Sequence, residues 1–249
     1  MDLTSGTPLW PTLIGLPAVY PRLRHDLRCD VAVIGGGITG ALVAHRFALA
    51  GIHTVLVEAD EIAHGSTAAT TALIQYEIDT HLTELIGRVG PDHAARSYQL
   101  CLEAVRGIEA LATSAGDGCG WRSTRSLYLG TRRRDRHRLE EELVARRAAG
   151  IEVDYLTERD IRERFSFGRP AALLSPAAGE VDAYRLAHKL LAEGRAAGLE
   201  VYDRTPVAKY LSASDGVELH TAGGQRISAR KAVFATGYET PAFLDQSIV

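Results

Sequence analysis

The first third of the chain has two short apolar runs separated by a helical pattern of hydrophobic positions. The runs are residues 30–34 (DVAVI) and 54–57 (TVLV), and their Val and Ile content is typical of strands buried on both faces. Residues 41–49 between them have the pattern of a helix, which we expect to end at Gly51. The pattern predicts a β-α-β unit, and its right-handed crossover makes the two strands parallel.

Helical spacing dominates the middle of the chain. We predict mainly helical structure from about residue 68 to 115. Pro91 suits a first helical position, and apolar residues recur at helical spacing from Ala94 to Leu111. A charged helix follows at 132–149, between strands at 126–129 and 152–156. Thr157 is expected to cap the next short helix, together with Asp160.

The last third mixes the two patterns again. Asp182 is expected to cap a helix over 183–197. Further strands are predicted at 200–202, 208–212, 217–219 and 231–235, with a hairpin turn at Asp215-Gly216. Residues 1–27 hold four of the nine prolines and no periodicity, so we expect them to be irregular. Strands mixed with helices throughout indicate an α/β fold.

Composition and charge narrow the class of protein. The chain has 249 residues with a formal net charge of −3, and 46% of its residues are hydrophobic, which is ordinary globular usage. The near-neutral balance predicts no nucleic-acid partner. No segment has the pattern of a signal peptide or a membrane helix, and three scattered cysteines indicate reduced thiols. We therefore expect a cytoplasmic protein without a membrane contact.

A glycine-rich loop follows the first predicted strand and opens the first helix. Gly35, Gly37 and Gly40 match the G-x-G-x-x-G pattern, in which glycines permit a tight turn, close approach to a pyrophosphate and helix–sheet packing. Glu58 ends the second strand, where a carboxylate can hold ribose hydroxyls. The combination predicts an adenine dinucleotide site. A free ribose 2′-hydroxyl is expected, which disfavours NADP and leaves NAD and FAD open.

Other enzyme classes have no support in the sequence. Ala41-Leu42 stand where a phosphate-binding loop of the Walker type needs Lys and Ser or Thr. No G-x-S-x-G elbow and no metal-ligand spacing of histidines occurs, so neither a hydrolase nor a metal site is predicted, and no catalytic residue is assigned. The arginines at 132–138 and the glutamates at 140–142 are interpreted as i, i+4 pairs on a solvated helix face.

Three consecutive blocks resemble a known family. Residues 30–40 (DVAVIGGGITG), 57–59 and 65–74 (GSTAATTALI) are similar to the N-terminal part of FAD-dependent oxidoreductases of the D-amino-acid oxidase type, which include glycine and sarcosine oxidases. The similarity resumes at 179–182, 205–207 and 233–237. The resemblance implies a Rossmann-like FAD-binding domain of the glutathione-reductase type, interleaved with a partial α+β substrate domain.

The resemblance also implies which residues contact FAD. They are Gly35, Gly37, Ile38, Thr39, Gly40, Glu58, Ala59, Ser66, Thr67, Thr71, Ala72, Val207, Thr236 and Gly237. Without the glycine loop upstream, the hydroxyl residues of this set would be interpreted as helix caps. The implied FAD-binding domain is discontinuous and covers 28–115 and 179–240, with part of the substrate domain included, after an irregular segment at 1–27. Residues 116–178 begin the substrate domain, and 241–249 form a truncated C-terminal end.

The family resemblance implies oxidation of the C–N bond of an amine or amino acid, with hydride transfer to flavin N5. Members of the family continue well past the Ala-Thr-Gly turn at 235–237, whereas this chain ends at Val249. An alternative is therefore an FAD-binding chain that is catalytically incomplete, with self-association or a partner chain completing the site. An NAD-dependent dehydrogenase is a third, weaker alternative.

Overall fold

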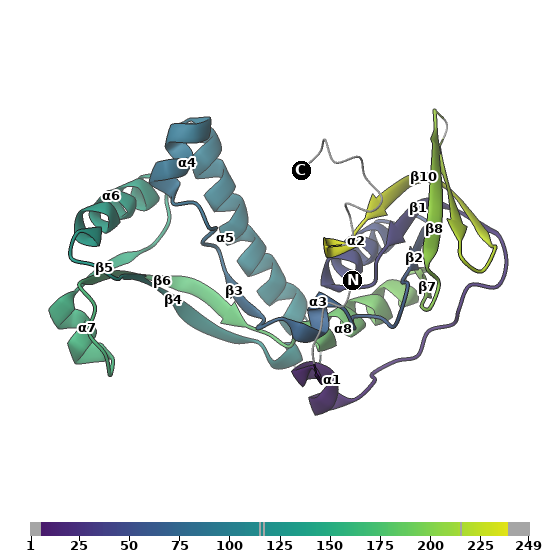
Figure 1. Ribbon diagram of the computed structural model, residues 1–249, viewed down its shortest axis with the longest axis horizontal. Helices are drawn as coiled ribbons and strands as arrows, with labels where there is room; N and C mark the ends of the chain where they lie inside the picture. The colour runs from purple at the N-terminus through teal and green to yellow at the C-terminus, as the bar shows by residue number, and fades with distance from the viewer. Residues whose placement is uncertain (1–5, 115, 117, 215, 239–249) are drawn as a thin grey trace. The chain divides into compact units, whose positions relative to one another are not determined.

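The computed structural model describes residues 6–114, 116, 118–214 and 216–238, in two compact units (Figure 1). The first unit comprises Met1–Thr71 and Asp182–Val249, and the second comprises Ala72–Val181. The predicted FAD-binding domain extends to residue 115, so its boundary differs from that of the first unit. Residues 72–113 pack within the second unit, where α5 (Pro91–Thr113) contacts β3 (Leu73–Gln75). The predicted end segment 241–249 lies outside the described residues.

A six-stranded sheet forms the centre of the first unit. Its order is β7 (Glu200–Tyr202), β2 (Thr54–Val57), β1 (Leu27–Ile34), β10 (Arg226–Phe234), β9 (Gly216–Thr221) and β8 (Val207–Ala213). The four strands from β7 to β10 run parallel, and β9 and β8 continue as an antiparallel meander. The predicted parallel pairing of the two apolar runs and the α/β fold class are confirmed.

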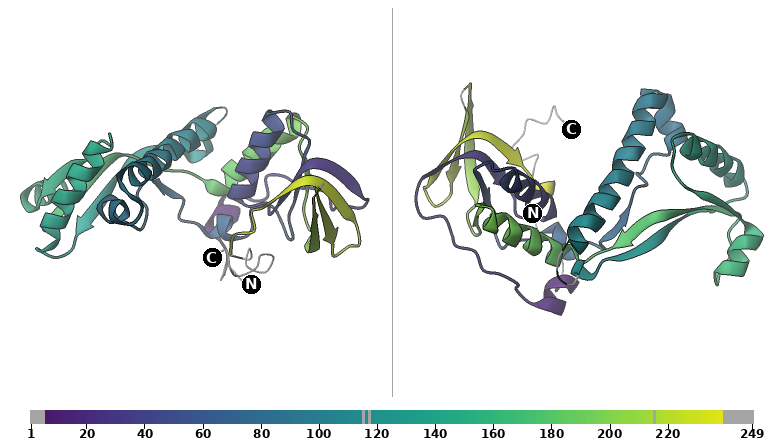
Figure 2. Two further views of the ribbon diagram at one scale, coloured as in Figure 1. Left: turned by 90° about the horizontal axis from the view of Figure 1, so that it is seen from above. Right: turned by 180° about the vertical axis from the view of Figure 1, so that it is seen from behind.

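Two long helices pack together on the first unit. These are α2 (Ile38–Leu49) and α8 (Ala183–Ala196), and Figure 2 shows them side by side in both views. Asp182 caps α8 as predicted, since its Oδ1 accepts a hydrogen bond from the backbone N–H of Arg185 at 2.9 Å. Two short helices, α1 (Leu9–Ile14) and α3 (Ser66–Ala69), contact each other.

The helix α1 contradicts the predicted irregular structure of residues 1–27. Pro8 is its N-terminal cap and Pro11 lies in its first turn. Backbone N–H groups in the first turn of a helix have no partner within the helix, so prolines cost little there. The proline content therefore excluded a long helix but not this short one.

Every strand of the second unit pairs with β6 (Ala171–Glu180). The strand β4 (Arg122–Gly130) lies along one edge of β6, while β3 and β5 (Asp154–Thr157) share the other, and all pairings are antiparallel. The helices of this unit are α4 (Leu82–Val89), α5, α6 (Asp135–Ala148) and α7 (Glu158–Arg164), with a 3-10 turn at Gly118–Gly120. Thr157 caps α7 in the predicted capping box with Asp160.

Helical structure dominates 68–115 as predicted, and α5 begins at Pro91. The short strand β3 in this range was not predicted; it follows Ala72, whose backbone φ angle is positive (52°). The ten-residue strand β6 was not predicted, because Ala, Gly and Pro176 are poor strand formers. Pairing along both edges stabilises β6, and Pro176 falls where the register with β4 shifts.

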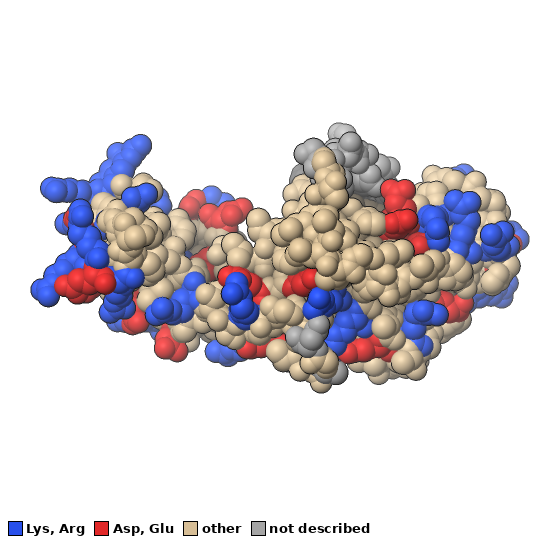
Figure 3. Space-filling view, turned by 90° about the horizontal axis from the view of Figure 1, so that it is seen from below, with Lys and Arg blue, Asp and Glu red and all other residues tan. Residues whose placement is uncertain are grey.

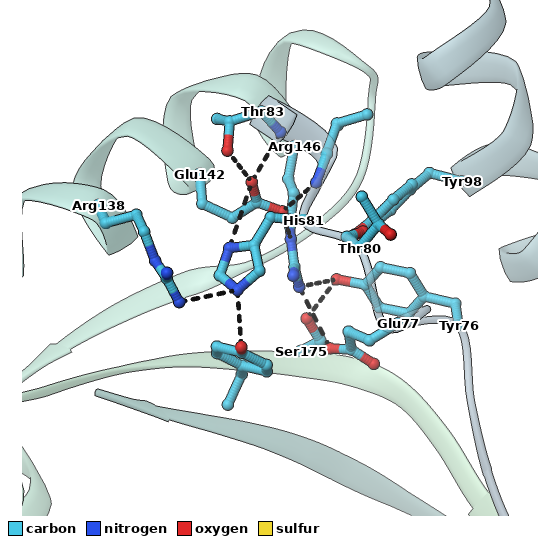
Figure 4. A network of polar contacts seen from close by, with 12 residues as sticks. Tyr76, Glu77, Thr80, His81, Thr83, Tyr98, Arg138, Glu142, Arg146 and Ser175 are labelled. Atoms are coloured by element: carbon cyan, nitrogen blue, oxygen red, sulfur yellow. Dashed lines mark hydrogen bonds and ion pairs between the residues drawn. The ribbon is translucent and has the colours of Figure 1, made fainter. Parts of the chain in front are cut away.

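A buried charge pair on α6 corrects the predicted solvated face. Glu142 and Arg146 are 0% and 1% exposed, and Arg146 Nε donates to Glu142 Oε1 at 2.8 Å (Figure 4). The Glu142 carboxylate also accepts from the backbone N–H groups of Leu82 and Thr83, each at 2.9 Å. Glu142 thus caps the N-terminus of α4 from another helix.

The same guanidinium group reaches the segment before α4. Arg146 Nη1 donates to the Tyr76 hydroxyl at 3.1 Å and lies 3.3 Å from Glu77 Oε1, which also accepts from Ser126 on β4. Arg146 therefore connects α6, the segment after β3 and the sheet. Glutamates 140 and 141 are exposed as predicted, and Figure 3 shows Lys and Arg gathered, with acidic residues among them, over the end of the second unit that carries α6 and α7.

Replacing Glu142 should destabilise the protein strongly. Burial alone would raise the pKa of Glu142, but the N–H groups of Thr83 and Leu82 and the Arg146 guanidinium lower it below its usual value. Glu142→Leu removes the closer of the two carboxylates at buried Arg146 and the acceptor of two α4 N–H groups, so we expect a loss of about 3–5 kcal/mol in the free energy of unfolding. Glu141→Leu on the exposed side of α6 is the control in denaturant unfolding, and equal losses would contradict the assignment.

A buried histidine predicts a pH dependence of stability. His188 on α8 is 4% exposed, and within the described residues neither ring nitrogen has a hydrogen-bond partner. Its ring contacts those of Tyr20 and Tyr184, and burial, with a smaller effect of His64, lowers the pKa of His188 to about 4. The unfolded chain therefore binds a proton first as pH falls, and stability is lost from about pH 6.5 downward.

The expected loss at pH 4 is about 3 kcal/mol relative to pH 7. Denaturant unfolding of His188→Leu should show a correspondingly weaker pH dependence over this range. The control His137→Leu removes a histidine whose side chain is 80% exposed and should keep the wild-type dependence. An unchanged slope in His188→Leu would contradict the assignment.

Candidate functional site

The glycine loop after β1 is a point of close backbone approach. Gly35 has a φ of 108°, and a Cβ atom there would lie 2.4 Å from the carbonyl oxygen of Ala235. A Cβ atom on Gly40 would lie 1.9 Å from the carbonyl oxygen of Gly35. Real Cβ atoms do not approach backbone so closely, so both positions require glycine. The loop therefore packs directly against the turn that follows β10.

The N-terminus of α2 begins in this loop. Gly37 is its cap residue and has no side chain to bond the first-turn N–H groups, and the first turn holds no acidic residue. The backbone N–H of Ile38 donates to the Thr67 hydroxyl at 2.9 Å. The positive end of a helix dipole with glycine at its cap suits an anionic ligand such as a pyrophosphate. The site thus fits the dinucleotide that the motif predicts.

Glu58 lies beside the same loop. One carboxylate oxygen accepts from the backbone N–H of Gly36 at 2.6 Å, and the other accepts from that of Asp60 at 3.0 Å. A Cβ atom on Gly36 would lie 3.0 Å from the Glu58 Cβ and 2.4 Å from the Ile62 side chain. Gly36 is therefore a residue that the sequence analysis missed, although the run of three glycines was the available signal.

The structure brings several, but not all, of the predicted residues together. Thr67 is buried and joins α3 to α2, whereas Ser66 and Thr71 are exposed. Val207 begins β8, two residues after Thr205, whose N–H donates to the carbonyl of Glu58 at 2.7 Å. Glu58 thus reaches the loop from the end of β2, and Val207 lies two residues beyond the contact between Glu58 and Thr205.

The remaining predicted residues lie in the turn after β10 and in the segment after α3. The backbone N–H of Ala235 donates to the carbonyl of Ile34 at 2.8 Å, which holds the turn containing Thr236 and Gly237 beside the glycine loop. Ala235 was not among the predicted residues, although its carbonyl oxygen is the atom nearest to the position of a Cβ on Gly35. Ala72 belongs to the second unit, so the structure does not relate it to the loop.

The described part of the chain shows no other candidate centre. No group of three or more His, Cys, Asp or Glu residues there has the arrangement of a metal site. None of its helices has the length and apolar character that crossing a bilayer requires. The glycine loop and the residues around it are therefore the candidate functional site.

Comparison with known proteins agrees with this geometry. The family model described as "FAD dependent oxidoreductase" (DAO) matches residues 30–248. The chain belongs to this family. Its cofactor is therefore FAD, which decides between the two dinucleotides that Glu58 left open.

Among curated proteins, this DAO-family chain is 33% identical over 153 residues to "Putative Rieske 2Fe-2S iron-sulfur protein YhfW" of Bacillus subtilis, covering 61% of this chain and 30% of that protein. A glycine oxidase structure from Geobacillus kaustophilus has a TM-score of 0.72 at 24% identity and is matched over 86% of this chain and 56% of its own.

An L-amino acid deaminase structure from Proteus vulgaris, with its specific insertion deleted, has a TM-score of 0.76 at 15% identity and is matched over 100% of this chain and 62% of its own. At these identities the two structures show a shared fold. The chain spans less than two thirds of the length of all three proteins.

Adding one methyl group at Gly40 should disrupt the site. Gly40→Ala places Cβ against the Gly35 carbonyl, so α2 has to move away from the sheet. We expect a lower melting temperature and loss of FAD binding. Gly107→Ala is the control, because a Cβ atom at that position in α5 meets nothing within 4 Å. Near-normal FAD binding by a folded Gly40→Ala variant would contradict the close packing described above.

Proposed function

We propose that this chain binds FAD across the carboxyl ends of β1, β2 and β10 and serves an enzyme that oxidises the C–N bond of an amino acid or amine. The observation that carries the proposal is the cradle formed by Gly35, Gly40 and the α2 N-terminus, which leaves backbone N–H groups at the positive end of a helix. Family membership supports the cofactor.

The proposal assigns residues to the pyrophosphate and to the ribose of FAD. The pyrophosphate lies on the α2 N-terminus at Gly37, Ile38 and Thr39, and Glu58 accepts hydrogen bonds from ribose hydroxyls. The remaining contacts come from Ala59, Ser66, Thr67, Thr71, Ala72, Val207, Thr236 and Gly237. When bound, FAD supplies the hydride acceptor of the oxidation, while the protein holds and orients the groups around it.

The substrate class is supported by the proteins that share the fold. Two of the matched structures are those of a glycine oxidase and an L-amino acid deaminase, and a third is that of an L-proline dehydrogenase. All three names refer to an amino acid. Because the chain spans 56% of the glycine oxidase, binding and turnover have to be measured separately.

The first experiment is a visible absorption spectrum of the purified chain, before and after addition of FAD. Two flavin bands, with FAD released on heating, would support the binding part of the proposal. Anaerobic bleaching of the bound flavin by a panel of amino acids and amines then tests turnover. Bound FAD that no member of the panel bleaches would contradict C–N oxidation by this chain alone, and absence of binding would contradict the whole proposal.

A carboxylate in the glycine loop should abolish binding. Gly37→Asp places a negative charge at the α2 N-terminus, where it repels the pyrophosphate. We expect colourless protein that does not titrate with FAD, and circular dichroism should show a retained fold. A yellow Gly37→Asp variant would remove the pyrophosphate from this helix terminus.

Glu58→Ala should weaken FAD binding without abolishing it. The change removes charged hydrogen bonds on the order of 1.5–3 kcal/mol, which corresponds to a roughly 10- to 100-fold higher dissociation constant. The matched control is Glu61→Ala in the same loop, whose carboxylate pairs with His64 instead. Equal dissociation constants for Glu58→Ala and the wild type, measured by flavin fluorescence, would show that Glu58 does not hold the ribose.

A further inference from the structure

The segment before β1 packs against the first unit although it adds no strand to the sheet. Within residues 8–26, Tyr20 and Leu23 are only 2% and 1% exposed. Figure 1 shows this segment in purple, passing from α1 along the outside of the unit to β1. The G-x-G-x-x-G motif does not require such a segment, so its burial calls for another explanation.

One end of the segment holds α3. The indole N–H of Trp10 on α1 donates to the carbonyl oxygen of Thr70 at 2.9 Å, across 60 residues of sequence. Thr70 is the C-terminal cap of α3, and the helix is only four residues long. A single helical turn is marginal by itself, so its position depends on such outside contacts.

A second residue of the α3 segment, Thr67, connects α3 to the glycine loop. Thr67 accepts from the N–H of Ile38 at 2.9 Å, and its hydroxyl would lie 3.1 Å from a Cβ atom on Gly37. Trp10 and Ile38 thus each hold α3 or its cap through one hydrogen bond. A displacement of α3 away from α1 would change what the first N–H groups of α2 present to a ligand.

The other end of the segment holds residues 203–205, which follow β7. The carbonyl of Pro21 accepts from the N–H of Asp203 at 3.1 Å, and the N–H of Leu23 donates to the Thr205 hydroxyl at 3.1 Å. Between these contacts, the Arg22 side chain donates to the carbonyl of Arg204 at 2.7 Å.

Two of these residues, Arg204 and Thr205, also contact the segment that follows β2. The N–H of Thr205 donates to the carbonyl of Glu58, and that of Arg204 donates to the carbonyl of Asp60, both at 2.7 Å. Residues 203–205 therefore lie between the N-terminal segment and the residue that faces the glycine loop.

Arg204 has an unfavourable backbone conformation, which the contacts around residues 203–205 stabilise. Arg204 has a φ of 45°, which is unfavourable for a residue with a side chain. Its guanidinium group donates to the carbonyl of Tyr20 at 3.0 Å and to Asp203. Tyr20 in turn stacks on His188 at 6.1 Å between ring centroids. The N-terminal segment thus stabilises a conformation that isolated residues 203–205 would leave.

We propose that residues 8–26 support the FAD site, with Trp10 as the positioning residue for α3 and the Leu23–Thr205 contact as the positioning contact for Glu58. The inference rests on the proposed function. None of these residues has to touch FAD. They hold α3 and residues 203–205, which are far apart in sequence. In these positions Thr67 and Glu58 meet the glycine loop.

The test compares Trp10→Phe with the wild type. The change removes the indole N–H but keeps an aromatic ring on α1. We expect an FAD dissociation constant about 2- to 10-fold higher, the effect of one lost hydrogen bond, with a nearly unchanged melting temperature of the FAD-free protein. Leu13→Ala, on the 63% exposed position of the same helix, is the matched control and should bind FAD as the wild type does.

The second contact is tested at Thr205. Thr205→Val keeps the side-chain shape and removes the hydroxyl, so the FAD dissociation constant should rise, and Thr205→Ser should restore it. Amide hydrogen exchange of the FAD-free variants gives a readout that does not depend on the ligand. Exchange should be faster at 66–71 in Trp10→Phe and at 58–60 in Thr205→Val, with β1 unchanged in both.

The outcomes separate the two proposals. If the wild type does not bind FAD, the proposed function fails and this inference fails with it. If the wild type binds FAD, and Trp10→Phe and Thr205→Val match it in dissociation constant and local exchange, only the inference is overturned. Faster exchange throughout the first unit would show a general structural role and would also overturn it.

Discussion

Backbone crowding at the carboxyl end of β1 is the constraint on which the first unit depends. Gly35, Gly40 and Ala235 meet there at distances that leave no room for a Cβ atom on either glycine. Because of this contact, α2 starts immediately against the sheet, and its N-terminal N–H groups open at the edge where β1, β2 and β10 end. A dinucleotide site at this edge is the consequence of how closely the backbone packs.

The rest of the site is assembled from distant parts of the chain. Glu58 bonds the loop from the end of β2, and Thr67 bonds α2 from α3. Both segments are short. Residues 8–26 contact α3 directly, through Thr70, and reach the Glu58 segment only through residues 203–205. The FAD-dependent oxidoreductase family explains why the glycine loop is present. The packing around the loop gives a physical reason for residues 8–26, the segment that precedes β1.

The second unit is organised by a different interaction. Arg146 and Glu142 are buried together, and their hydrogen bonds join α6 to the start of α4 and to the segment after β3. A buried ion pair repays its desolvation only when further groups satisfy its remaining hydrogen-bonding capacity. Backbone N–H groups, Tyr76 and Glu77 do so here, so the pair fixes how these elements meet.

The sequence by itself determined the features whose causes lie within a few residues of each other. The parallel β1 and β2 strands, the glycines of the loop and the caps at Asp182 and Thr157 follow from local pattern and backbone chemistry. Only the tertiary structure decided that β6 is a strand, because its Ala- and Gly-rich sequence pairs with partners far along the chain. It likewise decided that Glu142 is buried while its neighbour Glu141 is exposed, and that Trp10 meets Thr70. A helical period or a proline count contains no information about such partners, since contacts across 60 residues arise only when the chain folds.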